Sequence, residues 1–325
     1  MEKIPSLTAV YGINETYIVE QLEYALSMAK GEVPLKEFFV NSHPYTAAAL
    51  LHVAVMGLTF VIGTLQDEYS QVDRIWSLLP AFTIIMYTVH SYLNGIAASR
   101  LWIYTIIVVI WSVRLTYNFA RKGGYSGVED YRWQILRSKM TPLQFTVFSL
   151  TFISTAQIAL LLSITSPAIM FYYSDNEQIG IGDIGFAYSL LACVLVEGIA
   201  DDDQWRFQKA KAEFKASGKV SQGYTKPQLE RGFCTTGLFG FSRHPNFLAE
   251  QMFWVLPYLW NVHMTGKYIN WTIFGAVGYV LLFQASTFFT EYISTGKYPQ
   301  YAEYQRTVGR FLPGFSHWKE PFKYE

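Results

Sequence analysis

An arginine–histidine pair precedes an apolar run that itself contains an amide and a carboxylate. Arg243 and His244 stand just before this run, which extends to Trp260, and Asn246 and Glu250 lie near its start. The i, i+4 spacing of Asn246 and Glu250 puts both side chains on one face of a helix. Because a charge inside a bilayer helix is costly, an ionisable residue there indicates a functional site. These residue types suit a ligand that has one anionic end and one polar end.

Four other clusters combine acidic, arginine and aromatic residues at the ends of apolar runs. They are Asp73-Arg74-Ile75-Trp76, Arg114 with Glu129-Asp130-Tyr131-Arg132-Trp133, Glu197 through Phe207, and Glu291 with Tyr298, Tyr301, Tyr304 and Arg306. Simpler readings compete with a function. Trp76 and Trp133 are typical of the aromatic belt at a membrane boundary, and Arg114 suits a side chain that extends from a helix end into water. The run Asp201–Asp203 suits a solvated helix end equally well.

The composition is that of an integral membrane protein. Hydrophobic residues make up 51% of the chain, and charged residues make up 15%, against about 25% in a soluble domain. Crossing the hydrocarbon core takes roughly 20 apolar residues. We therefore predict an all-α, multi-pass transmembrane bundle of about seven spans. The spans are expected near Ala47–Leu65, Trp76–Asn94, Leu101–Ala120, Leu143–Ile164, Ile179–Val196, Phe247–His263 and Trp271–Thr290.

The charges predict an orientation rather than a nucleic-acid partner. Lys+Arg and Asp+Glu are equal in number, so the net charge is zero, and nothing indicates binding to nucleic acid. Basic residues collect in Arg121–Lys139, in Arg206–Arg243 and after Lys297. The positive-inside rule assigns these segments to the cytosol. Seven spans then leave the N-terminus on the other side, and we expect the membrane to be that of the endoplasmic reticulum.

Several common sites are missing from the sequence. No CxxC or HExxH motif and no cluster of histidines occurs, so no metal site is predicted. Neither a GxGxxG nor a Walker motif is present, so no soluble nucleotide fold is indicated. Cys193 is expected in a span and Cys234 in a cytosolic loop, which makes a disulfide between them unfavourable. His52 and His90 lie on apolar faces and suit packed bundle residues better than catalysts.

Taken together, these motifs resemble the steroid 5-alpha-reductase-like membrane family. Ser242-Arg243-His244-Pro245-Asn246-Phe247, followed by Glu250, is similar to the family's C-terminal signature. This superfamily includes sterol C14 and C7 reductases and, more distantly, isoprenylcysteine carboxyl methyltransferases. The four clusters at the ends of apolar runs resemble a poorly characterised branch of it. The resemblance covers about residues 45–315. It implies an N-terminal extension (1–44), followed by a membrane reductase-like domain (45–325) with its cofactor half at about 197–315.

The resemblance implies an NADPH site that faces the cytosol. It implies that Arg206, Arg243 and His244 meet the phosphates and that Asn246 and Glu250 hold the nicotinamide end. The forked guanidinium of arginine suits phosphate, and an amide with a carboxylate can bond a carboxamide. The remaining implied cofactor residues are Asp201, which belongs to the third cluster, and Tyr301 and Tyr304, which close the pocket with Arg306.

Three positions depart from the family pattern. Phe247 stands where tyrosine is expected, Ala249 where glycine is expected, and Asp203 where glutamine is expected. The first change removes a hydroxyl, and the second narrows any close approach of a ligand. The third adds negative charge beside the implied phosphate site.

The expected reaction is hydride transfer from NADPH to a polarised C=C bond of a lipid or sterol-like substrate, followed by proton donation from a protein acid. Candidate acids are Tyr87, His90 and Tyr117 by residue type, and Asp73 and Glu129 by membership of the shared motifs. One alternative is a methyltransferase that uses S-adenosylmethionine on a lipid or prenyl-cysteine. Another is a non-enzymatic membrane scaffold. The sequence leaves oligomeric partners open.

The orientation can be tested by cysteine labelling. Cysteines placed in the segment 206–243 of the chain in sealed microsomes should react with a membrane-impermeant reagent, because the excess of basic residues assigns this loop to the cytosol. A segment protected until detergent is added would contradict both the orientation and a cytosolic cofactor site.

Overall fold

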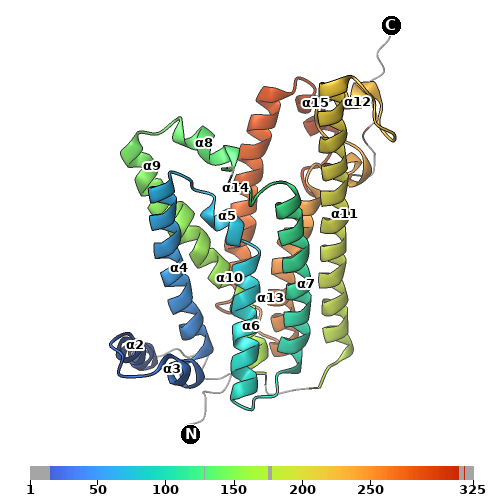
Figure 1. Cartoon of the computed structure of the whole chain (residues 1–325). Coiled ribbons are helices and arrows are strands. Elements are labelled where there is room, and N and C mark those ends of the chain that lie inside the picture. The colour runs from blue at the N-terminus through green and yellow to red at the C-terminus, as the bar shows by residue number, and fades with distance from the viewer. Residues whose placement is uncertain (1–14, 128, 175–177, 315–317, 319–325) are drawn as a thin grey trace. The chain divides into compact units, whose positions relative to one another are not determined.

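The computed structural model describes residues 15–127, 129–174, 178–314 and 318, and it consists of helices joined by loops (Figure 1). Within these residues no strand occurs, and the one sheet-like contact is an isolated parallel bridge between Ser242 and Gly309. The prediction of an all-α fold is confirmed.

The described chain contains five helical segments long and apolar enough to cross a bilayer. They are Pro44–Gln66 (α4), Ser99–Arg121 (α7), the continuous segment Pro142–Tyr172, Ile181–Ser217 (α11) and Ile273–Lys297 (α14). These segments establish a multi-pass helical membrane protein. The two other predicted spans correspond to helices outside this set, Leu78–Leu93 (α6) and Pro245–Thr265 (α13).

The chain divides into two compact units. Unit 1 comprises residues 1–188 and 256–278, and unit 2 comprises residues 189–255 and 279–325. Three helices, α11, α13 and α14, contribute residues to both units.

In unit 1, α10 (Gln157–Tyr172) packs against α4, α6 and α7. It continues from α9 (Pro142–Phe148) through a π-helical stretch, η1 (Ser149–Ala156). The sequence determines where this segment begins, because Thr141 and Gln144 form a capping box and proline occupies the first helical position. The other helices of the unit are α2 (Glu15–Ala29), α3 (Leu35–Asn41), α5 (Gln71–Ile75) and α8 (Tyr131–Arg137).

A glycine allows α14 to approach α10 closely in unit 1. A Cβ atom at Gly275 would lie 2.2 Å from the backbone oxygen of Ser163, which is closer than real atoms approach. Small residues serve this purpose in membrane helices, where close backbone contact replaces the hydrophobic effect as a source of association.

A buried ion pair joins three segments at one end of unit 1. The Arg100 guanidinium donates to both carboxylate oxygens of Asp183, at 2.8 and 3.0 Å, and the Trp260 indole donates to the same carboxylate at 2.6 Å. The side chains of Arg100 and Asp183 are each only 6% exposed. Their bonding therefore connects the starts of α7 and α11 with the second half of α13.

The two histidines on apolar faces are packed bundle residues, as predicted. His52 and His90 are both buried. His90 contacts the Tyr172 hydroxyl at 2.7 Å through Nδ1 and the Ser42 carbonyl at 3.1 Å through Nε2, so its Nε2 carries the proton that Ser42 accepts.

In unit 2, the 37-residue helix α11 extends further than the sequence suggested. The sequence predicts a loop over residues 206–243, but the helix continues to Ser217. Lys215 lies in the last turn, where a cation interacts favourably with the helix dipole. The shorter elements of the unit are α12 (Lys226–Arg231), η2 (Gly237–Gly240) and α15 (Tyr301–Thr307).

The Arg100 ion pair predicts a stability effect. Arg100→Ala should lower the free energy of unfolding by about 3–5 kcal/mol, because removal of one partner leaves a buried charge without its counterion. Thermal unfolding in detergent would measure it. The matched control is Arg206→Ala, whose ion pair with Asp202 is largely exposed and should matter less. Equal melting temperatures for Arg100→Ala and the wild type would contradict this role.

Candidate functional site

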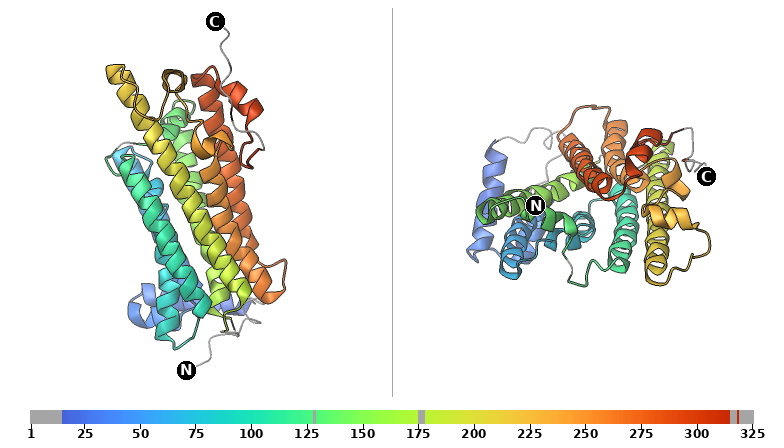
Figure 2. Two further views of the ribbon diagram at one scale, coloured as in Figure 1. Left: turned by 90° about the vertical axis from the view of Figure 1, so that its right-hand side faces the viewer. Right: turned by 90° about the horizontal axis from the view of Figure 1, so that it is seen from above.

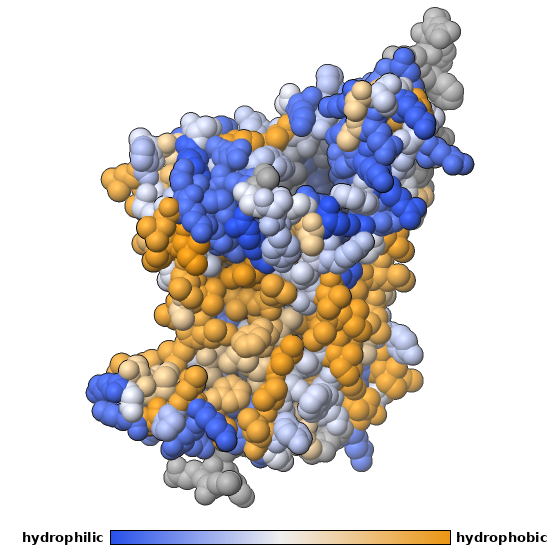
Figure 3. Space-filling view, viewed as in Figure 1, coloured by the Kyte–Doolittle hydropathy of each residue, from blue (hydrophilic) through white to orange (hydrophobic). Residues whose placement is uncertain are grey.

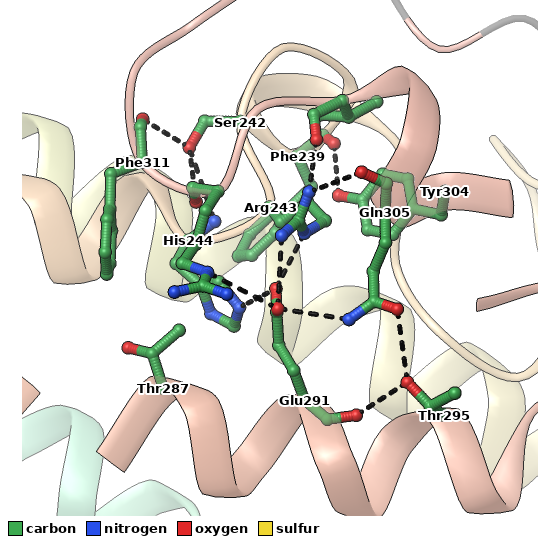
Figure 4. Close-up of polar contacts among 12 residues, drawn as sticks. Phe239, Ser242, Arg243, His244, Thr287, Glu291, Thr295, Tyr304, Gln305 and Phe311 are labelled. Atoms are coloured by element: carbon green, nitrogen blue, oxygen red, sulfur yellow. Dashed lines mark hydrogen bonds and ion pairs between the residues drawn. The ribbon is translucent and has the colours of Figure 1, made fainter. Parts of the chain in front are cut away.

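A buried carboxylate, Glu291, organises the Arg-His signature (Figure 4). Arg243 donates to both of its oxygens, from Nε at 2.6 Å and from Nη2 at 3.1 Å. His244 Nε2 lies 3.0 Å from Glu291 Oε1, and Gln305 Nε2 donates to Oε2 at 3.1 Å. We refer to Arg243, His244, Glu291 and Gln305 as the Glu291 cluster. All four lie in unit 2.

The backbone around the signature is bonded to the segment that follows α15. The amide of Arg243 donates to the carbonyl of Gly309 at 2.9 Å, and the amide of His244 donates to that of Arg310 at 3.0 Å. The Ser242 hydroxyl donates to the Phe311 carbonyl at 2.7 Å. These bonds hold the start of α13 in a defined position.

The structure shows protein acceptors around the Arg243 guanidinium. Besides Glu291, its Nη1 donates to the carbonyl of Gln305 at 2.9 Å and to the carbonyl of Val308. The side chain is 6% exposed. In this arrangement Arg243 positions the helix start and Glu291, whereas the sequence had suggested contact with phosphate.

Tyr301 and Tyr304, which were grouped with Glu291 in the sequence, pack next to the Glu291 cluster. Both belong to a buried hydrophobic cluster with Phe233, Val308 and Trp318. The Tyr304 hydroxyl donates to the Phe239 carbonyl at 2.5 Å. Burial raises the pKa of this hydroxyl, so it remains a protonated donor at neutral pH. Both tyrosines therefore stabilise the loop that carries the signature.

A second polar group lies between α11 and α13 in unit 2. Asn246 Nδ2 is 3.4 Å from Asp201 Oδ1. Helices α11 and α13 run antiparallel (Figure 1). The residue one turn before Asp201 on α11 and the residue one turn after Asn246 on α13 therefore lie at the same depth. Glu197 and Glu250 occupy these positions, and both are buried. We call Glu197, Asp201, Asn246 and Glu250 the acidic seam.

Glu250 is bonded to α14 and to its own helix. Its Oε1 accepts from the Tyr279 hydroxyl at 2.6 Å and from the Trp254 indole at 3.2 Å. Tyr279 and Trp254 are fully buried. A proton can move between a carboxylate and a buried phenol that are joined by a short hydrogen bond, as Glu250 and Tyr279 are. Because ionised groups inside membrane helices are costly, three buried carboxylates in one seam indicate a function.

Arg206 lies on a different face of α11 from the seam. At about 100° per residue, it is turned about 140° away from Asp201. It pairs with Asp202 at 2.8 Å and is 73% exposed. Arg206 lines an open groove of about 490 Å³ with Lys209 and Tyr224. The structure therefore does not bring Arg206 together with Asn246 and Glu250.

Two of the three departures from the family pattern, Asp203 and Phe247, have structural explanations. Asp203 accepts from the amide of Leu238 at 3.3 Å and so caps the first turn of η2. Phe247 stacks on the His244 ring at a centroid distance of 5.4 Å and meets Phe283 edge-on. Ala249 is buried. Phe247 therefore packs against the signature histidine.

The motif acids proposed as proton donors connect the segment around α5 with the segment around α8 in unit 1. Asp73 accepts from the Trp133 indole at 2.8 Å and lies 3.6 Å from Arg132. Burial raises the pKa of the Asp73 carboxyl, and the Arg132 guanidinium opposes that rise. Trp133 is buried, so its assignment to an aromatic belt was wrong.

Glu129 has a similar role between the same two segments. It accepts from the Tyr69 amide at 3.0 Å and from Arg137 at 2.6 Å. The motif around Asp73 and the motif around Glu129 thus bind one another, although they lie far apart in the sequence.

The donor candidates chosen by residue type differ in burial. The Tyr87 hydroxyl lies 3.3 Å from that of Thr165, and Tyr87 is fully buried. Tyr117 is 65% exposed and lies beside Arg121. Tyr87 remains a candidate within unit 1.

Sequence reasoning placed Glu291 and Glu197 among the motif residues without giving either a role, and it missed Tyr279. A carboxylate inside an apolar run was a usable signal for Glu291 and Glu197. Tyr279 carried no such signal, because a tyrosine in an apolar helix is unremarkable until its hydroxyl is known to reach Glu250.

The Glu291 cluster predicts a large effect of a small substitution. Glu291→Gln should lower the free energy of unfolding by about 3–5 kcal/mol, because it leaves the buried Arg243 without a counterion. Differential scanning fluorimetry in detergent would measure the change. Glu230→Gln is the matched control, because Glu230 is exposed and such substitutions change stability by about 0.5 kcal/mol or less. If the two variants melted together, Glu291 would not have this role.

Comparison with known proteins gives a family without a described activity. Residues 59–308 match the family model described as "Protein of unknown function (DUF1295)". An uncharacterized protein of Schizosaccharomyces pombe is 36% identical over 305 residues, which cover 91% of this chain and 89% of the relative. No solved structure matches. The chain therefore belongs to the DUF1295 family.

Proposed function

We propose that the protein is an NADPH-dependent reductase of a C=C bond in a lipid or sterol-like substrate. The observation that carries the proposal is the acidic seam, in which an amide and a carboxylate lie one helical turn apart beside Asp201. A carboxamide offers both an N–H donor and a carbonyl acceptor, and Glu250 and Asn246 supply the complementary groups. The resemblance to the steroid 5-alpha-reductase-like family supports this proposal.

Unit 2 contains polar and charged residues that suit both ends of NADPH. Asn246, Asp201 and Glu250 would hold the nicotinamide ring. Their carboxylates would stabilise the positive charge that the ring acquires when it gives up hydride. The phosphates need cations that are accessible, which favours Arg306 and Arg310. Arg310 has a side chain 40% exposed at the edge of the Glu291 cluster. NADPH would supply the hydride.

Within unit 2, Tyr279 is a candidate proton donor. Reduction of a C=C bond requires a proton at the carbon that does not receive hydride. The Tyr279 hydroxyl is bonded to Glu250 at 2.6 Å, and a second carboxylate, Glu197, lies at the same depth in the seam. Asp73 and Glu129 are weaker candidates, because Trp133 and Arg137 bond their carboxylates.

The proposed substrate would come from the bilayer itself. Exposed apolar side chains cover the membrane-spanning helices, as on α4 and α7, so an apolar molecule would reach the protein by diffusion within the membrane. The membrane of the endoplasmic reticulum is the proposed location.

One observation favours a second candidate, a methyltransferase that uses S-adenosylmethionine. The seam contains three buried carboxylates, and carboxylates attract the permanent positive charge of a sulfonium. The N–H groups of Arg243 meanwhile donate to Glu291 and to two backbone carbonyls. These bonds weaken the argument that Arg243 binds a phosphate. The two candidates use the same seam and differ in the group transferred.

Isotope transfer distinguishes the candidates. Membranes that contain the protein should transfer deuterium from NADPH, labelled in turn on each face of the hydride-donating carbon, to a lipid. Glu250→Gln should abolish that transfer, because the ring end loses a carboxylate. Tyr279→Phe should reduce it while leaving binding of NADPH, measured by thermal shift, largely intact. Glu230→Gln is the matched control and should behave as wild type.

The same membranes test the opposing outcomes. A methyl label from S-adenosylmethionine that appears in lipid or protein and is lost in Glu250→Gln would replace the reductase with the methyltransferase. If neither label were transferred, a scaffold without chemistry would be the remaining interpretation.

Ligand-dependent stability gives an independent readout. A cofactor present at 100 times its Kd should stabilise the folded protein by about 2.7 kcal/mol. A melting temperature raised by NADPH and unchanged by S-adenosylmethionine is the expected result, and the reverse would contradict the reductase proposal.

A further inference from the structure

The N-terminal helix α2 has three distinct faces. Winding at about 100° per residue puts Ile18, Val19, Leu22 and Leu26 on one side, and their side chains are 47%, 50%, 55% and 58% exposed. Next to them lie the exposed polar residues Glu20 and Glu23. The third side faces the protein. A helix in the protein interior has no exposed apolar face, and a surface helix in water exposes polar residues. The exposed apolar face of α2 therefore requires an apolar environment outside the protein.

The third face fixes how α2 is rotated. Ala25 is buried with Phe38 of α3 and Ala47 of α4, and Tyr24 and Met28 pack against the same group. Gln21 Oε1 accepts from the amide of His43 at 2.8 Å, directly before α4 begins. The exposed apolar face therefore cannot turn inward without breaking this packing.

The orientation of α2 shows what its apolar face meets. Figures 1 and 2 show α2 lying crosswise to α4, at the end where α4 begins. The 23-residue α4 is itself a candidate span and exposes Val53, Leu58, Val61 and Leu65 along its length. Figure 3 shows apolar side chains over α4 and polar ones beside α2 and α3. A helix across the end of a span lies at the level of the lipid headgroups.

We infer that α2 is an interfacial helix that lies in the surface of the bilayer, with the Leu22 face on acyl chains and the Glu23 face in water. Leu35 at the start of α3 is 70% exposed and extends the same apolar surface. The orientation predicted from the basic loops puts this leaflet on the non-cytosolic side. The inference depends on unit 1 and is independent of any reaction in unit 2.

Two neighbouring positions make a matched test. Leu22 and Glu23 adjoin in the sequence, and their side chains point about 100° apart. In full-length protein with Cys193 and Cys234 replaced by serine, a single cysteine at either position would carry an environment-sensitive fluorophore. After reconstitution into phosphatidylcholine vesicles, the label at Leu22→Cys should be quenched several-fold more by spin-labelled lipid than by aqueous iodide. The label at Glu23→Cys should show the reverse preference.

Each other outcome contradicts the inference. Equal iodide quenching at both positions would mean that the apolar face is in water. Crosslinking between Leu22→Cys chains that persists as the vesicles are diluted with lipid would mean that a second copy covers the face. Leu26→Cys repeats the measurement one turn along, and thermal unfolding of each labelled protein shows that it is folded.

Discussion

The carboxylate of Glu291 is the constraint on which the arrangement of unit 2 depends. An ionised carboxylate among apolar helices is stable only when donors surround it. Arg243, His244 and Gln305 provide these donors from segments more than ten residues away. The same interaction therefore satisfies a buried charge and joins the start of α13, the end of α14 and the chain around α15.

The position of α13 determines the position of the acidic seam. Pro245 begins the helix directly after the two residues bonded to Glu291. Asn246 and Glu250 follow within the next two turns, so their depth is set by where the helix starts. The signature is accordingly a structural device, because the bonds of Arg243 and His244 to Glu291 fix the position from which Asn246 and Glu250 face α11.

Unit 1 applies the same principle at its ends. Polar bonds gather where helices begin or end, as in the pair of Arg100 with Asp183 and in the bond from Trp133 to Asp73. Between these ends the helices pack through apolar and small residues such as Gly275. These polar bonds gather at the ends of the helices because a lipid environment penalises every unsatisfied donor or acceptor.

The sequence by itself determined the all-α fold and the approximate position of each apolar span, because apolar runs and their flanking charges reflect the bilayer directly. It also singled out the residues around Arg243 and Glu250 as a candidate site, because charges are rare in such runs. It did not reveal that α11 continues to Ser217. Only the tertiary structure decided which partner each charge has. Arg243 meets Glu291 across 48 residues of sequence, and Tyr279 meets Glu250 across 29. No local pattern encodes such distances, because they arise from how separate helices pack.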